Sequence, residues 1–271
     1  MCFCQPPNME TRTLENSAAY LLKSVARMKN NCPRLRILDV GVGPGTISKG
    51  FAQTIPDGHV TAVDLSPHSL EKARNLARRT NLTNITFLQA DIHKLPFADG
   101  SFDVTHCHQV LTHVQKPVGA LQEMLRVTRP GGIVAAREGD LDTECMWPST
   151  LGLVKFHAFV HAMMKARGGC TTSGRQLLSW AIEAGVERGQ VMHSFSASCY
   201  STPEEKGAWA RGMIEEIKGS PWRQAGTATG MATEQDFHEM AEAWKRWAEE
   251  DGASLGMMQG EILITKLMEV K

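Results

Sequence analysis

Three closely spaced glycines near residue 40 are the clearest candidate for a ligand-binding loop. Residues 36–46 read Arg-Ile-Leu-Asp-Val-Gly-Val-Gly-Pro-Gly-Thr, so Gly41, Gly43 and Gly45 follow a short apolar segment that contains Asp39. Glycine has no β-carbon and reaches backbone angles that other residues avoid, which lets a ligand approach the main chain closely. We therefore expect a nucleotide-like cofactor at this loop.

The residues around the glycines indicate which cofactor binds. A dinucleotide fingerprint needs a further glycine at position 46, where this chain has Thr46. Asp39 precedes the first glycine, where its carboxylate would repel a diphosphate and attract a cationic amino-acid group, directly or through water. This charge pattern favours S-adenosylmethionine. It argues against a nucleotide-dependent oxidoreductase, which would use a similar sheet.

Two further acids end apolar segments downstream. Asp64 closes residues 60–64, where a carboxylate can accept hydrogen bonds from both hydroxyls of a ribose. Asp91 closes residues 85–91 and can accept a hydrogen bond from an adenine amino group, with Ile92 as an apolar neighbour. Three acids thus end three successive predicted strands, as a site at the carboxyl ends of parallel strands requires.

The elements that position these acids alternate between strand and helix. Strands are expected at 35–40, 59–64, 85–89, 102–107 and 132–138, and helices at 13–29, 45–55, 67–80 and 117–128. Right-handed crossovers would join them into a mainly parallel sheet with a crevice at its carboxyl end. Helical patterns at 147–182 and 203–250 separate this part from two later strands, expected at 190–199 and 260–266.

The order of these motifs resembles a known family. The segment from Asp39 to Thr46, Asp64, Ala90-Asp91-Ile92, Leu95-Pro-Phe and Arg129-Pro-Gly-Gly is similar to class I S-adenosylmethionine-dependent methyltransferases, especially the branch of ubiquinone and menaquinone biosynthesis. The likeness covers residues 10 to 140. Residues 12–20 also resemble a helix that precedes the core in relatives acting on small molecules, among which the fungal gliotoxin-type bis-thiomethyltransferases are particularly similar.

This resemblance implies a Rossmann-like α/β fold, with a seven-stranded, mainly parallel sheet flanked by helices and a helical lid. It implies an N-terminal helical segment at 1–31 over the cofactor site and a cofactor-binding core at 32–146. A lid insertion would follow at 147–189, and 190–271 would complete the core with antiparallel edge strands and further helices. Ordinary packing of an amphipathic helix would explain the pattern of 147–182 equally well.

The expected site combines the motifs with their neighbours. The cofactor-binding candidates are Tyr20, Asp39, Gly41, Gly43, Gly45, Thr46, Asp64, Leu65, Ala90, Asp91, Ile92, His108 and Gln109. The candidate catalytic residues are His113 and His108, because the resemblance places the fourth strand and its exit beneath the donor methyl group. His113 could relay a proton or orient the substrate, although a structural histidine at a strand end would give the same pattern.

Methyl transfer from a sulfonium donor requires the nucleophile, the methyl carbon and the sulfur nearly in line, so positioning is the main task. A thiol, with a pKa of about 8.5, needs little help to ionise, whereas an aliphatic alcohol needs a placed base or a metal. The sequence shows no strong base constellation. The acids Glu138, Asp140 and Asp142 rank below His113, because solvated loop acids are common.

The prediction is therefore S-methylation of thiol groups in a fungal dithiol metabolite of the gliotoxin type, with S-adenosylhomocysteine as the second product. O- or C-methylation of a phenolic, quinone or polyketide metabolite is the alternative. A noncatalytic partner subunit that binds the cofactor is the rival from another class, because the three acids concern donor binding and not the chemistry.

Composition favours a soluble enzyme that acts on a small molecule. The chain has 271 residues, 42% of them hydrophobic, and no long apolar run, which is enough for one large domain with a lid. Its first residues lack the basic start and apolar stretch of a signal peptide, so the cytoplasm is expected and no membrane. Basic and acidic residues number 29 each, so the chain has no net positive charge that would attract nucleic acid.

The cysteines and histidines do not suggest a metal. The seven cysteines, which include Cys2 and Cys4, lack C-x-x-C spacing, so reduced thiols are expected. His106 and His108 would share a face only in a fully extended strand, and no acid-rich ligand cluster accompanies them. The prediction is a protein without a metal site.

Overall fold

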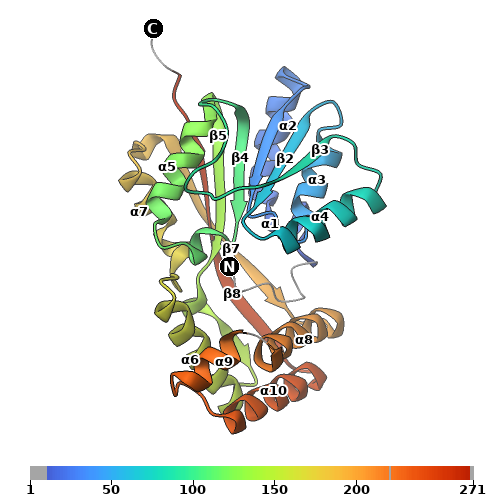
Figure 1. The fold of residues 1–271 in the computed structure, drawn as a ribbon, viewed down its shortest axis with the longest axis vertical. Helices are drawn as coiled ribbons and strands as arrows, with labels where there is room; N and C mark the ends of the chain where they lie inside the picture. Colours follow the sequence, from blue (N-terminus) through green and yellow to red (C-terminus); the bar gives the residue numbers. More distant parts are fainter. Residues whose placement is uncertain (1–10, 220, 269–271) are drawn as a thin grey trace.

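The computed structural model describes residues 11–219 and 221–268 of the chain. A single eight-stranded sheet runs through it, with helices on both faces and a helical lobe beyond one end (Figure 1). The strand order is β3-β2-β1-β4-β5-β8-β6, and β7 pairs with β8 off this path. Two of the cysteines noted above, Cys2 and Cys4, lie outside the described residues.

Five parallel strands carry the predicted motifs. They are β1 (Arg36–Val40), β2 (His59–Asp64), β3 (Ile85–Gln89), β4 (Phe102–His108) and β5 (Thr128–Gly139). The helices between them are α3 (Thr46–Thr54), α4 (Pro67–Arg79) and α5 (Pro117–Val127). All the elements expected here are present, and the largest difference is that β5 begins at Thr128 and not at residue 132. The predicted Rossmann-like α/β class is confirmed.

Side-chain alternation along the strands builds a core on each face of the sheet. On one face, Leu38 and Ile262 are buried with Leu121 of α5 and Leu177 of α7 (Ser173–Glu183). On the other face, neighbouring residues such as Ile37 are buried with Phe51 of α3. Because the sheet is covered on both sides, its carboxyl end is the edge at which the strand-ending acids can reach a ligand.

The last strands extend the sheet beyond the parallel part. Strand β8 (Ser254–Thr265) is antiparallel to β5, and β7 (Val191–Tyr200) is antiparallel to β8. The short β6 (Cys145–Trp147) pairs with the start of β8. The sequence predicted seven strands and no strand at 145–147, because three residues are too few to show a period. It also placed the start of the last strand at residue 260, six residues after Ser254.

The helical lobe has a core of its own, rich in aromatic side chains. It contains α6 (Leu151–Ala166), α8 (Pro203–Gly219), α9 (Pro221–Ala228) and α10 (Glu234–Glu249). The rings of Phe156 and Trp244 meet edge-on with centroids 5.3 Å apart, and Trp244 meets Trp247 at 5.4 Å. Segment 147–189, expected as one lid insertion, is therefore divided, since α6 packs in the lobe and α7 packs against the sheet.

The N-terminal part of the described chain forms two helices where one, at 13–29, was expected. They are α1 (Leu14–Ser17) and α2 (Ala19–Asn31), with Ala18 between them in a non-helical conformation. Leu14 is buried against Gly50 of α3, at a point where a β-carbon on Gly50 would lie 2.5 Å from it. No helix among the described residues is both long and apolar enough to cross a membrane.

Candidate active site

A cavity of about 740 Å³ lies between the carboxyl end of the parallel strands and the helical lobe. Its lining extends from Gly41 and Asp64 at the sheet to Phe156 and Trp209 in the lobe. Thr11, Arg12 and residues of α1 line it as well. One continuous space therefore connects the predicted cofactor loop with an apolar chamber.

Most of the predicted site residues line this cavity. Those that do are Gly41, Gly43, Asp64, Leu65, Ala90, Asp91, Ile92, His108, Gln109 and His113. The cavity lining does not include Tyr20, Asp39, Gly45 or Thr46.

The glycine loop needs glycine for both its backbone angles and its packing. Gly41, Gly43 and Gly45 have φ values of +74°, +54° and +89°, in the left-handed region that side chains disfavour. A β-carbon on Gly41 would lie 2.3 Å from Val110 Cγ2, and one on Gly45 would lie 2.8 Å from Ala73 Cβ. Gly41 therefore lets the β4 exit approach the loop, and Gly45 lets α3 approach α4.

Asp64 holds the loop and faces the cavity. Its Oδ2 accepts a hydrogen bond from the backbone N–H of Gly43 at 3.0 Å, and its Oδ1 accepts one from Ser66 N–H at 2.8 Å. Each carboxylate oxygen keeps a further lone pair. Within the described part of the chain Asp64 forms no ion pair, so a ligand with two hydroxyl groups fits this buried acid well.

Asp91 and its neighbours form the adjacent wall. Asp91 Oδ1 accepts a hydrogen bond from His93 N–H at 2.9 Å and lies 3.0 Å from His93 Nδ1. The backbone hydrogen bond is the main cause that lowers the pKa of Asp91, so this carboxyl is an ionised acceptor at neutral pH. Ala90 and Ile92 flank it with small and apolar surface, which suits the edge of a planar base.

Asp39 does not face the cavity, contrary to the charge argument made for it. Its carboxylate is buried, accepts a hydrogen bond from Ser48 Oγ of α3 and lies 2.8 Å from Nδ1 of His106 on β4. It therefore joins β1, α3 and β4. Tyr20 is partly buried, its hydroxyl has no hydrogen-bond partner in the described part of the chain, and burial of this group raises its pKa well above the usual value.

Glu138 is a buried acid that holds the backbone after β4, and not a solvated loop acid. Its carboxylate accepts hydrogen bonds from the backbone N–H groups of Val110, Leu111 and Thr112 at 2.9, 2.8 and 3.2 Å. Burial raises its pKa to about 7, while these hydrogen bonds act in the opposite direction. It fixes the turn after β4, in which Gln109 has a φ of +57° and the short helix η2 (Leu111–His113) begins.

The two candidate catalytic histidines line the cavity as neutral imidazoles. Arg137 Nη1 lies 3.0 Å from His108 Nε2. Burial is the main cause that lowers the pKa of His108 well below its usual value, and the positive charges of Arg12 and Arg137 lower it further. Burial and then Arg12 lower the pKa of His113 to about 4. So weak a base is better suited to hydrogen bonding with a substrate than to removing its proton.

The lobe side of the cavity contributes residues that the sequence did not single out. Its apolar wall consists of Phe156, Phe159, Met164, Trp209, Met213 and Trp222. Glu144 and His157 also line it, with Glu144 Oε2 3.4 Å from His157 Nδ1. The sequence did contain one indication of this contact. His157 and His161 are four residues apart, which places both on one face of a helix that could meet the acids after β5.

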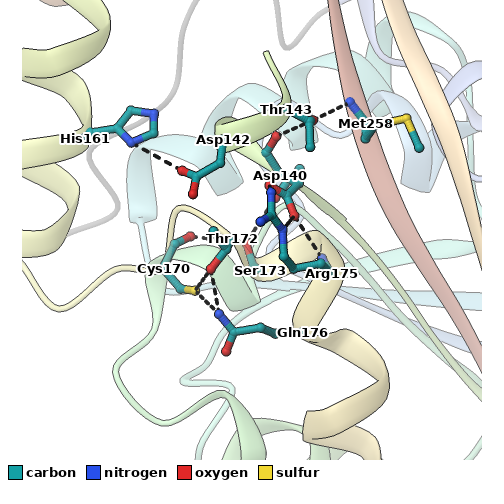
Figure 2. Close-up of polar contacts among 11 residues, drawn as sticks. Asp140, Asp142, Thr143, His161, Cys170, Thr172, Ser173, Arg175, Gln176 and Met258 are labelled. Carbon is teal, nitrogen blue, oxygen red and sulfur yellow. Dashed lines mark hydrogen bonds and ion pairs between the residues drawn. The ribbon is translucent and has the colours of Figure 1, made fainter.

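The segment after β5 is held in place from several sides, as Figure 2 shows. Asp140 forms an ion pair with Arg175 of α7, with Arg175 Nη2 2.6 Å from Oδ1. Asp142 lies 3.5 Å from Nδ1 of His161. Among the residues described, no group of three or more His, Cys, Asp or Glu side chains is arranged to hold a metal ion.

Comparison with known proteins places this geometry in context. Residues 32–185 match the family model described as a methyltransferase domain. A Schizosaccharomyces pombe protein named as an uncharacterized methyltransferase is 36% identical, over 94% of this chain and 91% of its own length. A probable methyltransferase of Aspergillus luteorubrus is 28% identical, over 95% of this chain and 92% of its own. The solved structure of a Bacillus halodurans protein, titled a putative methyltransferase, has a TM-score of 0.58 at 18% identity and covers 91% of this chain and 99% of its own, which supports the fold.

Proposed function

The chain belongs to the methyltransferase-domain family, and on that premise we propose that it transfers a methyl group from S-adenosylmethionine to a thiol of an apolar small molecule. It is an enzyme, a small-molecule methyltransferase that uses S-adenosylmethionine. The observation that carries the proposal is the single cavity that joins the glycine loop and Asp64 to an apolar chamber under the lobe.

The residues at the sheet end of the cavity fit the donor. When bound, S-adenosylmethionine supplies a methyl group activated by a positively charged sulfur. Asp64 would accept hydrogen bonds from the ribose, and Asp91 with Ile92 would hold the adenine. Gly41 and Gly43 would allow the amino-acid part to approach the backbone, and Gln109 and His108 would lie at the other edge.

The chain's own task is to position the acceptor and exclude water. The lobe closes one side of the cavity with aromatic and methionine side chains, and Arg12, Asn16 and Ser17 close another. Removal of water leaves the acceptor nucleophile poorly solvated, and fixing its orientation lowers the barrier further. Such a wall fits an apolar, ring-containing acceptor better than a highly charged one.

A gliotoxin-type dithiol remains the first acceptor that we propose, because a thiol ionises readily. A phenolic hydroxyl is the second candidate, and a specific observation favours it. Glu144 has a carboxyl group on the cavity wall with only 7% of its side chain exposed, a potential base that the sequence did not reveal. A protein of Aspergillus nomiae named as an O-methyltransferase is 34% identical over 54% of this chain and 64% of its own length.

The test is methylation of a defined panel by the purified protein. Methyl-labelled donor would be combined with a small aromatic dithiol, a phenol and a 1,3-diketone, while calorimetry measures S-adenosylhomocysteine binding. Label transferred first to sulfur would support the proposal, and label on oxygen or carbon would identify the alternatives. Binding without transfer to any acceptor would favour a noncatalytic partner. Imaging of the tagged protein would test the proposed cytoplasmic location.

A further inference from the structure

A carboxyl group with only 7% of its side chain exposed lies on the lobe side of the cavity beside a half-buried imidazole, and the proposed function gives this pair no defined step. The pair consists of Glu144, which follows the short helix η3 (Leu141–Thr143), and His157 of α6. We propose that Glu144 is the catalytic residue that accepts the proton of the group being methylated, and that His157 is its positioning residue. This inference rests on the proposed function and names the base for the acceptor.

The geometry places the carboxylate where an acceptor must lie. Glu144 lines the cavity although only 7% of its side chain is exposed, so its carboxyl group faces the chamber and not bulk water. Its Oε2 lies 3.4 Å from His157 Nδ1. Within the described residues it forms no other ion pair, so the carboxylate is not neutralised by a lysine or arginine.

His157 is fixed by its surroundings. Its ring meets Phe156 nearly at right angles with centroids 5.7 Å apart, and the ring of buried Trp244 lies at 6.3 Å. Its Nε2 is buried and has no hydrogen-bond partner among the residues described, whereas its Nδ1 faces Glu144. With Nδ1 protonated, the imidazole would donate toward the carboxylate and hold its orientation.

The residues just before Glu144 are held against the sheet, and Figure 2 shows the hydrogen bond from Met258 to Thr143. Thr143 Oγ1 accepts a hydrogen bond from Met258 N–H of β8 at 2.9 Å, and Asp140 N–H donates to Met258 O at 3.0 Å. Arg175 adds the ion pair to Asp140. A base held on such a support can keep its position as the acceptor enters, which general base catalysis requires.

The charged and titratable groups around Glu144 come from several elements. His157 of α6 is paired with Glu144, the charge of Glu144 acts on Tyr200 of β7, and Asp142 lies two residues earlier on the same segment. The same cavity is also lined by Arg12, His161, Glu205 and Glu216. Burial raises the pKa of Glu144 to about 8, and burial lowers the pKa of His157 to about 4. Glu144 is therefore mostly protonated at pH 7, and its ionised form, which increases as pH approaches 8, has a basicity matched to a thiol with a pKa of about 8.5 or a phenol near 10.

The proposed reaction moves one proton to Glu144 and one methyl group to the acceptor. The S–H or O–H bond of the acceptor breaks, and its proton moves to the carboxylate of Glu144. The electron pair left on sulfur or oxygen forms the new bond to the methyl carbon. The bond from that carbon to the donor sulfur breaks, and its electron pair stays on the sulfur, which becomes a neutral thioether. The proton leaves Glu144 for water after the methylated product departs.

The decisive variant is Glu144→Gln, with Asp142→Asn as the matched control. Both remove a carboxylate that lies beside a histidine of α6, but Asp142 does not line the main cavity. Phenol and the more acidic thiophenol serve as probes with the purified enzyme. Glu144→Gln should lower kcat by about 100-fold or more with phenol and far less with thiophenol, because an ionised acceptor needs no base. Asp142→Asn should match the wild type with both.

A readout without turnover tests the same carboxyl. Subtracting the Glu144→Gln infrared spectra from those of the wild type should leave one protonated carboxyl band that disappears as pH rises through about 8, because Glu138, whose pKa is raised to about 7, contributes equally to both proteins. Equal losses with both probes, or no such band in the wild type, would overturn the inference. A wild type that binds S-adenosylhomocysteine and methylates neither probe would instead contradict the proposed function, and the infrared band would still decide whether Glu144 titrates as inferred.

Discussion

Arg137 Nη1 lies 3.0 Å from Nε2 of His108, and the two residues face each other in the register of β5 and β4. A guanidinium has donors only, so Nε2 must accept and the imidazole proton must reside on Nδ1. Arg137 Nε also lies 3.1 Å from Oε1 of Glu261 on β8. Three neighbouring strands therefore share one buried polar network at the cavity edge, and it determines which nitrogen of His108 can serve a ligand.

Arg137→Met tests the energetic part of this network. The substitution leaves the carboxylate of Glu261, whose side chain is 10% exposed, without its cation, and we expect a loss of about 3–5 kcal/mol in the free energy of unfolding. Glu261→Gln in the same chain should recover part of that loss, because the uncompensated charge is then gone. Urea unfolding of the two single variants and the double variant measures the coupling. Strictly additive losses would show that the two side chains act independently.

Asp64→Ala tests the donor end of the cavity. The change removes the acceptor oxygens expected for the ribose and also the partners of the Gly43 and Ser66 N–H groups. We expect the affinity for S-adenosylhomocysteine to weaken by about 1–3 kcal/mol. Calorimetry on the variant measures this, with Asp57→Ala on the exposed turn before β2 as control. Unchanged affinity in Asp64→Ala would refute the assignment.

Gly45→Ala tests the packing of the glycine loop at a residue that does not line the cavity. A β-carbon there would lie 2.8 Å from Ala73 Cβ, and the φ of +89° is strained for alanine. The combined clash and strain should destabilise the fold by about 2–3 kcal/mol. Thermal unfolding gives the comparison, with Gly189→Ala as the control because nothing lies within 4 Å of its added carbon. Equal melting temperatures for both variants would contradict this account of Gly45.

The parallel half of the fold was predictable because its signals are local. Each strand from β1 to β5 contains a short apolar stretch, Asp64 is the last residue of β2, and Asp91 lies two residues after the end of β3. The glycine loop was equally clear, since positive φ values at Gly41, Gly43 and Gly45 demand that residue type. Carboxyl ends of parallel strands meet at one edge, which brought these motifs to one cavity.

The features that the sequence did not reveal depend on contacts between distant segments. Asp39 was predicted to bind the cofactor because of its charge. Its partners Ser48 and His106 are distant in the sequence and come beside it only when α3 and β4 pack. Glu144 and His157 are thirteen positions apart and meet only because the lobe folds back over the segment after β5. Helical periodicity of α6 could not distinguish this arrangement from ordinary packing.

His113→Gln tests how the buried imidazole makes stability depend on pH. In the unfolded chain this histidine takes up a proton below about pH 6.5, whereas in the folded protein burial lowers its pKa to about 4. Between these pH values the unfolded state binds more protons than the folded state. The stability that the neutral His113 gives to the folded protein is therefore fully present above pH 6.5 and is lost as pH falls toward 4. The difference in free energy of unfolding between pH 7 and pH 5 should therefore shrink by about 1–2 kcal/mol in His113→Gln, after allowance for screening through the cavity. Urea unfolding at both pH values measures this difference, with the exposed His68 of α4 substituted as His68→Gln for the control. If His113→Gln shows a difference as large as that of the wild type, His113 is protonated to the same extent in the folded and unfolded states.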